Sequence, residues 1–297
     1  MLKTIVSVFT VLCCLHVRIR PVNTKTLPDP ETTRSSDDEA PPPPQEAAPT
    51  PSSSHANASL NVPSAPLLRI PLSLFPDSVD DMYYGCSHQM LIKVKRHHLP
   101  RSSREGLDST YTKLCALKAM KTKDPYDLLS WDHFRALCAY TAGSYNDLNR
   151  AVRTGKASYK TSFEFHSLHF LLTDAIRLLK VNQRNCFTSY RRSRLLFSGE
   201  AGQTIRFGSF ASSSLNKDLK QFGRRTCFEI HTCFGAYLKS YSEFDSDEDE
   251  VLIPPYEMFE IVSVDASGQN ELDCEVVFKL ETAGVHSGLN CQAVDTV

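Results

Sequence analysis

The chain has 297 residues, of which 41% are hydrophobic, so it can bury a substantial core and is not a wholly disordered protein. Its 33 basic and 34 acidic residues give a net charge of -1. This balance provides no global attraction to nucleic acid or to an anionic membrane, and we expect no nucleic-acid partner.

The N-terminal residues have the layout of a secretory signal peptide. Lys3 precedes an apolar run that Arg18 and Arg20 end, and the run is shorter than the roughly 20 apolar residues of a membrane-spanning helix. We therefore predict a signal peptide at residues 1–20 and a secreted, extracellular protein. Residues 283–297 are mixed and polar, so we expect no membrane anchor.

A linker is predicted at residues 21–76, where Pro, Ser, Ala, Asp and Glu dominate and no hydrophobic period is visible. Asn57 begins an Asn-Ala-Ser sequon within this segment. Because the chain is expected to be secreted, Asn57 is a predicted N-glycosylation site.

A single folded domain is expected at residues 77–297. Apolar residues recur at helical spacing over 165–179, and a second helix is expected over 131–140. Short runs typical of strands follow at 195–198, 204–209, 226–232, 250–253 and 258–264. Helices followed by strands indicate an α+β fold with a mainly antiparallel sheet, and no Gly-x-Gly-x-x-Gly motif supports a Rossmann fold.

Disulfides are the expected state of the cysteines. The chain has ten, and removal of the signal peptide with Cys13 and Cys14 leaves eight, an even number suited to an oxidising compartment. No Cys-x-x-Cys is present and no histidine pair at ligand spacing lies beside the cysteines, so no metal site is expected. The spacing alone does not fix the pairing.

The first of three segments with chemical potential is the basic stretch at residues 190–194, which leads into strand-like sequence. Basic clusters are usually solvated. An arginine held rigidly in a strand, such as Arg191, is instead able to clamp a diphosphate with its planar, permanently charged group.

The second segment is a strand that runs into a serine cluster at residues 206–215. Such serines usually satisfy backbone groups in turns. No Gly-x-Ser-x-Gly motif surrounds them, so a hydrolase nucleophile is not expected, and orientation of a carboxylate is the functional alternative.

The third segment is the acidic run at residues 245–250, which an apolar strand follows directly. Most acidic runs stay in water. In an extended backbone, Glu248 and Glu250 would point to the same side and Asp249 would point away into solvent. Two carboxylates on one side suit chemistry that passes through a cation.

These three segments together resemble the arginine-serine-glutamate signature of the vertebrate arginine-specific ecto-mono-ADP-ribosyltransferases. Tyr-Arg stands at 190–191, Phe-x-Ser-x-Ser at 210–214 and Glu-x-Glu-Val-Leu-Ile-Pro-Pro at 248–255. Flanking segments are similar as well, so the resemblance covers about residues 77–291. It implies a helical N-terminal part packed on two mainly antiparallel β-sheets that form an NAD cleft.

The resemblance implies a role for each member of the signature. Arg191 would hold the NAD diphosphate, and Ser212 would position Glu250 and the nicotinamide ribose. Glu250 would be the central catalytic residue, because a carboxylate stabilises the ribosyl cation that forms when nicotinamide leaves. Glu248 would bind the acceptor arginine and accept its proton.

Two positions depart from the family pattern. Arg192 stands where glycine is usual, which would hinder backbone approach to the ligand, and Ser209 stands where glutamine is usual. We assign Ser209 to the NAD-binding residues with Arg191 and Ser212. Tyr140 is either a further NAD contact or an aromatic packed at a helix end.

The resemblance also pairs Cys86 with Cys291 and Cys186 with Cys233. It leaves four cysteines to form further bridges or to remain buried thiols: Cys115, Cys138, Cys227 and Cys274.

The function that the resemblance implies is mono-ADP-ribosyl transfer from NAD, a co-substrate, to arginine-bearing proteins without a metal; the family also accepts NADP. One alternative is an NAD glycohydrolase, in which water is the acceptor. A second alternative is a secreted binding module that kept the fold and lost the chemistry.

Overall fold

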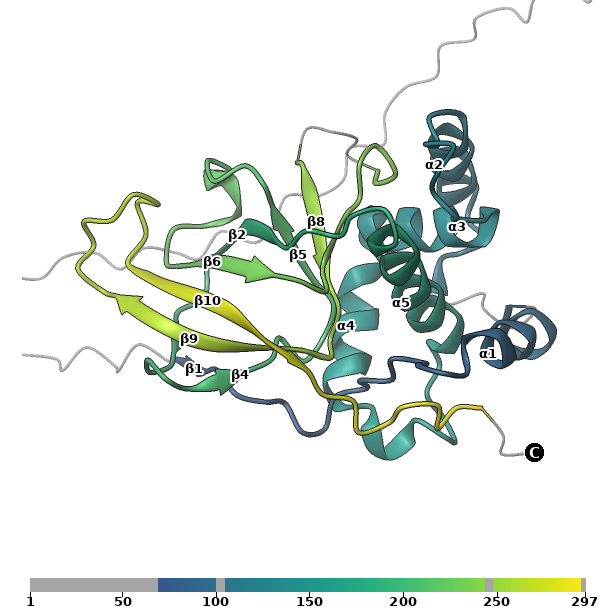
Figure 1. Cartoon of the computed structure of the whole chain (residues 1–297), viewed down its shortest axis with the longest axis horizontal. Helices are drawn as coiled ribbons and strands as arrows, with labels where there is room; N and C mark the ends of the chain where they lie inside the picture. The colour runs from purple at the N-terminus through teal and green to yellow at the C-terminus, as the bar shows by residue number, and fades with distance from the viewer. Residues whose placement is uncertain (1–68, 100–104, 244–247, 295–297) are drawn as a thin grey trace, which may run out of the picture. The chain divides into compact units, whose positions relative to one another are not determined.

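A computed structural model describes residues 69–99, 105–243 and 248–294 (Figure 1). The predicted signal peptide, Asn57 and most of the predicted linker lie outside the described residues. Residues Val62–Val297 form one compact unit. Within the described ranges, no helix is both long and apolar enough to cross a membrane.

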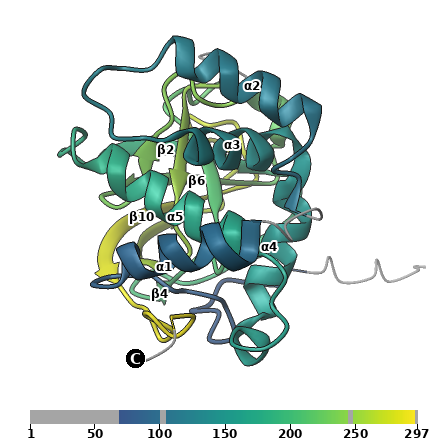
Figure 2. The same ribbon diagram turned by 90° about the vertical axis from the view of Figure 1, so that its right-hand side faces the viewer.

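Five α-helices occupy the first half of the described chain, as Figure 2 shows with the helices in front of the sheet. They are α1 (Ser87–Lys93), α2 (Thr110–Lys121), α3 (Trp131–Ala139), α4 (Tyr145–Thr154) and α5 (His166–Lys180), with short irregular turns η1 (Val94–His98), η4 (Tyr140–Ser144) and η5 (Lys156–Ser158). The two predicted helices correspond to α3 and α5. α5 was predictable because apolar residues cover one of its faces continuously.

The strands follow as one eight-stranded sheet in the order β4-β9-β10-β6-β2-β5-β8-β7. Their bounds are β2 (Phe187–Ser193), β4 (Thr204–Ile205), β5 (Ala211–Ser214), β6 (Thr226–Thr232), β7 (Ala236–Tyr237), β8 (Glu250–Ile253), β9 (Glu257–Asp265) and β10 (Val276–Val285). A short η6 turn (Lys220–Phe222) precedes β6. Only the β10–β6 pair of this sheet is parallel, so the α+β class and the mainly antiparallel pairing are confirmed.

The two expected sheets are joined in this structure. β2 pairs with β5 at a single position, Tyr190 opposite Ser214. This one bridge connects the five strands from β4 to β2 with the three strands β5, β8 and β7. The separate second sheet is only a parallel pair of β1 (Ile70–Pro71) with β3 (Phe197–Ser198).

The folded region begins before the expected boundary at residue 77. The amide of Ile70 donates to the carbonyl oxygen of Leu196 over 2.8 Å, and the amide of Leu72 donates to that of Ser198 over 2.8 Å. Leu72 is buried against the sheet. The proline-rich composition of the preceding residues hid this short strand from the sequence pattern.

The described residues form four disulfides: Cys86–Cys291, Cys115–Cys138, Cys186–Cys233 and Cys227–Cys274. The first and third are the pairs that the resemblance implies. Cys115–Cys138 joins α2 to α3, and Cys227–Cys274 joins β6 to the segment before β10. His231 lies near the sulfurs of Cys186 and Cys233, but a disulfide already uses both sulfur atoms.

Candidate active site

A cavity of about 560 Å³ opens between the helical part and strands β2 and β5. Tyr140, at the end of α3, contributes from the helical side, Arg191 from β2 and Ser212 from β5. Glu248 and Glu250 also line it, at the start of β8. The fold therefore brings together five of the six side chains that the sequence assigned to the site.

Strand register places the arginine, the serine and the glutamate. Ser214 of β5 lies opposite Glu250 of β8, so Ser212 lies one diagonal step from Glu250 on the same face. The Nη1 atom of Arg191 donates to the backbone oxygen of Ser212 over 2.5 Å, which fixes the arginine of β2 against β5.

The carboxyl group of Glu250 is buried, with 4% of the residue exposed. Burial raises its pKa to about 7, and the nearby negative charge of Glu248 adds to the rise. A hydrogen bond from the Ser212 hydroxyl and the positive charge of Arg191 act in the opposite direction on this pKa. Near neutral pH, Glu250 therefore exchanges readily between its acid and carboxylate forms.

Tyr140 supports the serine from the helical side. Its hydroxyl donates to the backbone oxygen of Phe210 over 3.3 Å and accepts from the Nδ2 atom of Asn149 over 3.3 Å. Burial raises the pKa of Tyr140, and a hydrogen bond with the Ser212 hydroxyl opposes that rise. Tyr140 is thus an aromatic residue packed at a helix end that also lines the cavity, and its contact with NAD stays a prediction.

The backbone turns between the two glutamates. Asp249 has a φ of 43°, so residues 248–250 are not extended. The carboxylate of Asp249 accepts a hydrogen bond from the Tyr237 hydroxyl over 3.0 Å, and the expectation that it points into solvent is wrong. The Ser214 hydroxyl donates to the backbone oxygen of Glu248 over 2.5 Å and anchors the turn beside the cavity.

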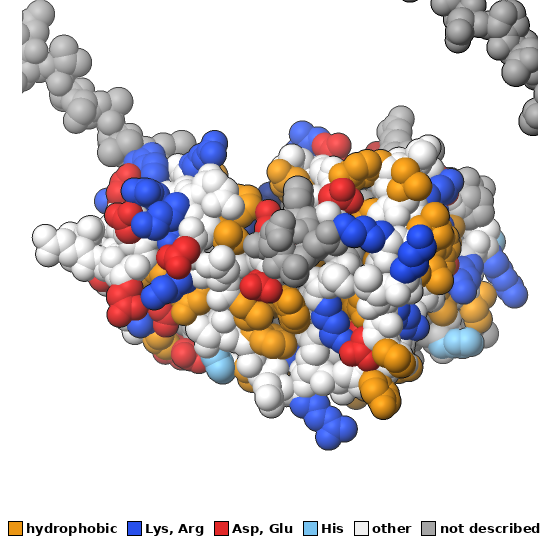
Figure 3. Space-filling model, turned by 90° about the horizontal axis from the view of Figure 1, so that it is seen from above, with side chains coloured by type: hydrophobic (Ala, Val, Ile, Leu, Met, Phe, Trp, Pro, Cys, Tyr) orange, Lys and Arg blue, Asp and Glu red, His pale blue; other side chains and the backbone are white. Residues whose placement is uncertain are grey.

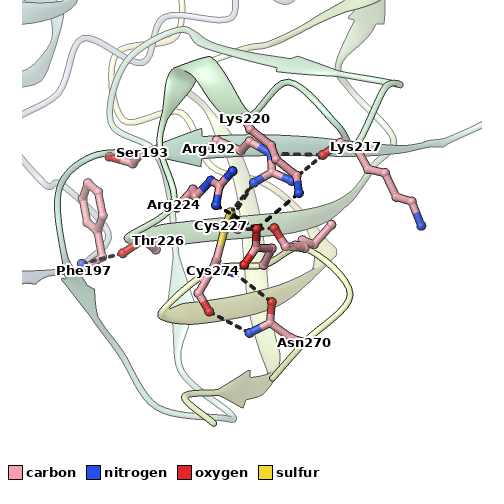
Figure 4. The surroundings of a disulfide bond; sticks show 12 residues. Arg192, Ser193, Phe197, Lys217, Lys220, Arg224, Thr226, Cys227, Asn270 and Cys274 are labelled. Carbon is pink, nitrogen blue, oxygen red and sulfur yellow. Dashed lines mark hydrogen bonds and ion pairs between the residues drawn. A yellow bond between two sulfur atoms is a disulfide. The ribbon is translucent and has the colours of Figure 1, made fainter. Parts of the chain in front are cut away.

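Arg192 directs its guanidinium toward Lys217 and the Cys227–Cys274 disulfide (Figure 4). Its Nε and Nη2 atoms donate to the backbone oxygen of Lys217 over 3.0 and 2.6 Å. Its Nη1 atom lies 3.5 Å from each sulfur of the Cys227–Cys274 disulfide. Arg192, which stands where glycine is usual, therefore stabilises the loop at residues 215–223 through these hydrogen bonds.

That loop, residues 215–223, forms a wall of the cavity through Asn216, Leu219 and Phe222, none of which was predicted. Gly223 has a φ of 135°, and a Cβ atom there would lie 2.3 Å from the backbone of Ser193. The only signal in the sequence was this glycine, which allows the loop to return against β2.

Ser209 lies apart from these groups. It is 1% exposed, its hydroxyl donates to the backbone oxygen of Phe210 over 3.4 Å, and it does not line the cavity. Its expected contact with NAD is not supported by this position, because the side chain is buried outside the cavity lining.

Comparisons with known proteins agree with this geometry. The family profile described as NAD:arginine ADP-ribosyltransferase matches residues 72–277. NAD(P)(+)–arginine ADP-ribosyltransferase 2 of Gallus gallus is 33% identical over 252 residues, which are 81% of this chain and 78% of the relative. Ecto-ADP-ribosyltransferase 5 of Rattus norvegicus is 36% identical over 239 residues, or 71% of this chain and 73% of the relative.

Solved structures give the same result. The crystal structure of the eukaryotic mono-ADP-ribosyltransferase ART2.2 matches with a TM-score of 0.60 and 30% identity, covering 75% of this chain and 98% of that one. A variant of ART2.2 in complex with NAD matches with a TM-score of 0.59 and 31% identity over the same shares of both chains.

Proposed function

Because the chain belongs to the NAD:arginine ADP-ribosyltransferase family, we propose that it transfers ADP-ribose from NAD to arginine side chains of proteins and releases nicotinamide. The observation that carries this proposal is the buried carboxyl group of Glu250, which meets Ser212, Arg191 and Glu248 in one cavity. An inactive binding module would have no use for a buried carboxyl group between a serine, an arginine and a second carboxylate.

NAD, as the co-substrate, supplies a glycosidic bond that breaks with the electron pair leaving on nicotinamide. The carboxylate of Glu250 stabilises the positive charge that develops on the ribose. Arg191 presents a charged group to the diphosphate, and Ser212 orients Glu250, with Tyr140 holding the serine hydroxyl from the other side. These residues account for the chemistry without a metal.

Glu248 distinguishes transfer to arginine from hydrolysis. A guanidinium stays protonated near neutral pH because its pKa exceeds roughly 12, and the protonated group is a poor nucleophile. In our proposal, the carboxylate of Glu248 binds the guanidinium, directs one nitrogen to the ribosyl carbon and takes the proton as the new C–N bond forms. Its position on the cavity wall beside Glu250 supports this role.

We further propose that the enzyme acts outside the cell. Four disulfides and relatives named as ecto-enzymes support an oxidising compartment. Relatives from two species are named as GPI-linked, so the expected absence of an anchor stays a prediction. The signal peptide and the glycosylation of Asn57 also stay predictions, as does the linker ahead of the catalytic domain.

Labelled NAD and agmatine, a small arginine mimic, test the proposal. We expect the purified wild type to form ADP-ribosyl-agmatine, Glu250→Gln to lose both adduct formation and NAD cleavage, and Glu248→Gln to lose the adduct while cleavage persists. Free ADP-ribose without adduct in the wild type would identify a glycohydrolase. If neither product formed, we would assign the chain to the class of binding modules.

A further inference from the structure

Helix α2 has the reverse of the usual distribution of side chains. Its buried positions hold small residues, and its large apolar residues are in water. The buried residues are Thr112, Cys115, Ala116 and Ala119. The exposed ones are Tyr111, Leu114, Leu117 and Met120, with exposed fractions of 53%, 61%, 49% and 46%.

The small inner face explains how the helix is held. Two alanines and a threonine bury little apolar area, so they contribute little to the free energy of docking. The Cys115–Cys138 disulfide supplies a covalent attachment to α3, and the Ser109 hydroxyl accepts from the amide of Thr112 over 3.0 Å at the N-terminus. The outward apolar side chains are therefore not needed to fix the helix.

Lysines alternate with these outward side chains. At 100° per residue, Lys113, Lys118 and Lys121 fall between the four apolar residues, and all three are exposed. Residues 110–123 contain four lysines and no acidic residue, although Lys113 lies 3.4 Å from Asp108. We call these seven exposed residues the α2 face: Tyr111, Lys113, Leu114, Leu117, Lys118, Met120 and Lys121.

The space-filling view shows this character. Figure 3 looks down on the top of Figure 1, and on its right, where α2 lies, hydrophobic side chains are interspersed with Lys and Arg. Contiguous exposed apolar side chains rimmed by charge mark interaction sites on soluble proteins. A partner that fits would be apolar and acidic.

Contacts join the α2 face to residues 239–243, which precede Glu248 in the chain and which we call the acceptor side of the cavity. The Tyr111 hydroxyl donates to the carboxylate of Glu243. The Ser240 hydroxyl donates to the Thr122 hydroxyl over 3.0 Å. Both ends of α2 thus contact residues 240–243, which lead along the chain to Glu248. The amide of Glu243 also donates to the hydroxyl of Thr141, a residue of the cavity wall.

We propose that the α2 face is a docking surface for the arginine-bearing acceptor protein, which it binds through an apolar patch that carries acidic side chains. This inference rests on the proposed function and names the substrate class. An acceptor whose arginine enters the cavity must also cover the neighbouring surface, and the α2 face is joined to the cavity wall through Glu243 and Thr141. Docking there raises the effective concentration of the arginine at the cavity.

Two synthetic peptides test the proposal. Each carries one arginine and a linker of about twelve Gly and Ser residues, which spans roughly 20 Å. The docking peptide continues into a helical segment with Leu and Glu on one face, and the control peptide has Ser in place of each Leu. We expect a kcat/KM about 10-fold higher for the docking peptide, with the advantage reduced by added salt.

Matched variants locate the effect. Leu114→Ser with Leu117→Ser should abolish the advantage of the docking peptide and leave agmatine modification unchanged, because both side chains are exposed. Leu195→Ser with Val262→Ser removes two comparably exposed side chains from other parts of the surface and should keep the advantage.

The remaining outcomes are separable. Equal kcat/KM for the two peptides, with normal agmatine modification, would overturn the docking surface and leave the proposed function intact. Absence of agmatine modification in the wild type would defeat the proposed function itself. If the wild type sedimented with phosphatidylserine vesicles and the Leu114/Leu117 variant did not, the α2 face would bind a membrane instead. If light scattering showed a dimer that the same variant lost, the α2 face would bind a second copy of the chain.

Discussion

The NAD side and the acceptor side of the cavity are built in different ways. On the NAD side, backbone pairing in β2, β5 and β8 sets the positions of the reactive groups. On the acceptor side, side chains hold residues 239–243: the Nζ atom of Lys239 lies 2.9 Å from Asp124 and 2.7 Å from Asp127. The groups on the NAD side lie in short sequence motifs, whereas these contacts on the acceptor side join residues 112 positions or more apart.

The difference explains how one cavity serves both substrates. Strand register leaves little freedom to the groups that we propose meet NAD, since a one-residue slip would turn every side chain to the other face. Segments joined by side chains are easier to change without disturbing the sheet. The predictions below test whether the two sides are as separate as this description requires.

The largest effect is expected for Ser212→Ala on the NAD side. Loss of the hydroxyl removes a hydrogen bond to Glu250 and a contact with Tyr140, and we expect NAD cleavage to fall about 10² to 10³-fold. Steady-state kinetics with labelled NAD measures this. Ser213→Ala is the control, because that hydroxyl bonds to Ser189 instead, and similar losses in both variants would contradict the assignment.

An intermediate effect is expected for removal of the Cys115–Cys138 disulfide on the acceptor side. Because the loop that it closes spans 23 residues in sequence separation, Cys115→Ala with Cys138→Ala should lower the free energy of unfolding by about 3 kcal/mol. NAD cleavage by the folded variant should persist. Denaturant unfolding and labelled-NAD assays measure the two quantities.

The matched comparison is removal of the Cys186–Cys233 disulfide. Cys186 lies immediately before β2, so this change should reduce NAD cleavage as well as stability. If the folded Cys115/Cys138 variant lost NAD cleavage to the same extent, the two sides of the cavity would not be separable.

The smallest effect concerns pH and connects the two sides. Glu250 must be a carboxylate to stabilise the ribosyl cation, and its pKa is raised to about 7, so NAD cleavage should increase as pH rises through 7. Glu248→Gln removes a neighbouring negative charge that raises this pKa. The midpoint should therefore move to lower pH, by about one unit or less.

The pH profile of kcat/KM for NAD measures the shift. Asp249→Asn changes the charge at the intervening residue, whose carboxylate faces Tyr237, and should leave the midpoint in place. An unchanged midpoint in Glu248→Gln would show that the two carboxylates do not interact.

Sequence reasoning succeeded where a local pattern determines structure. The strands expected at 226–232 and 250–253 coincide with β6 and β8, because dense β-branched and apolar residues lie between clear breaks. α2 was not predicted, since its large apolar residues lie on the exposed face. The direction of Asp249 was predicted wrongly because a left-handed residue interrupts the two-residue alternation of an extended chain.

The neighbouring arginines of β2 have a consequence for how such an enzyme evolves. Consecutive side chains of a strand leave on opposite faces, so Arg191 bonds to the backbone oxygen of Ser212 while Arg192 bonds to that of Lys217. Arg192 and the 215–223 loop that it supports both line the cavity, so a substitution at position 192 alters one wall of the cavity. Selection is thus able to change the shape of this wall while Arg191 keeps its hydrogen bond to Ser212.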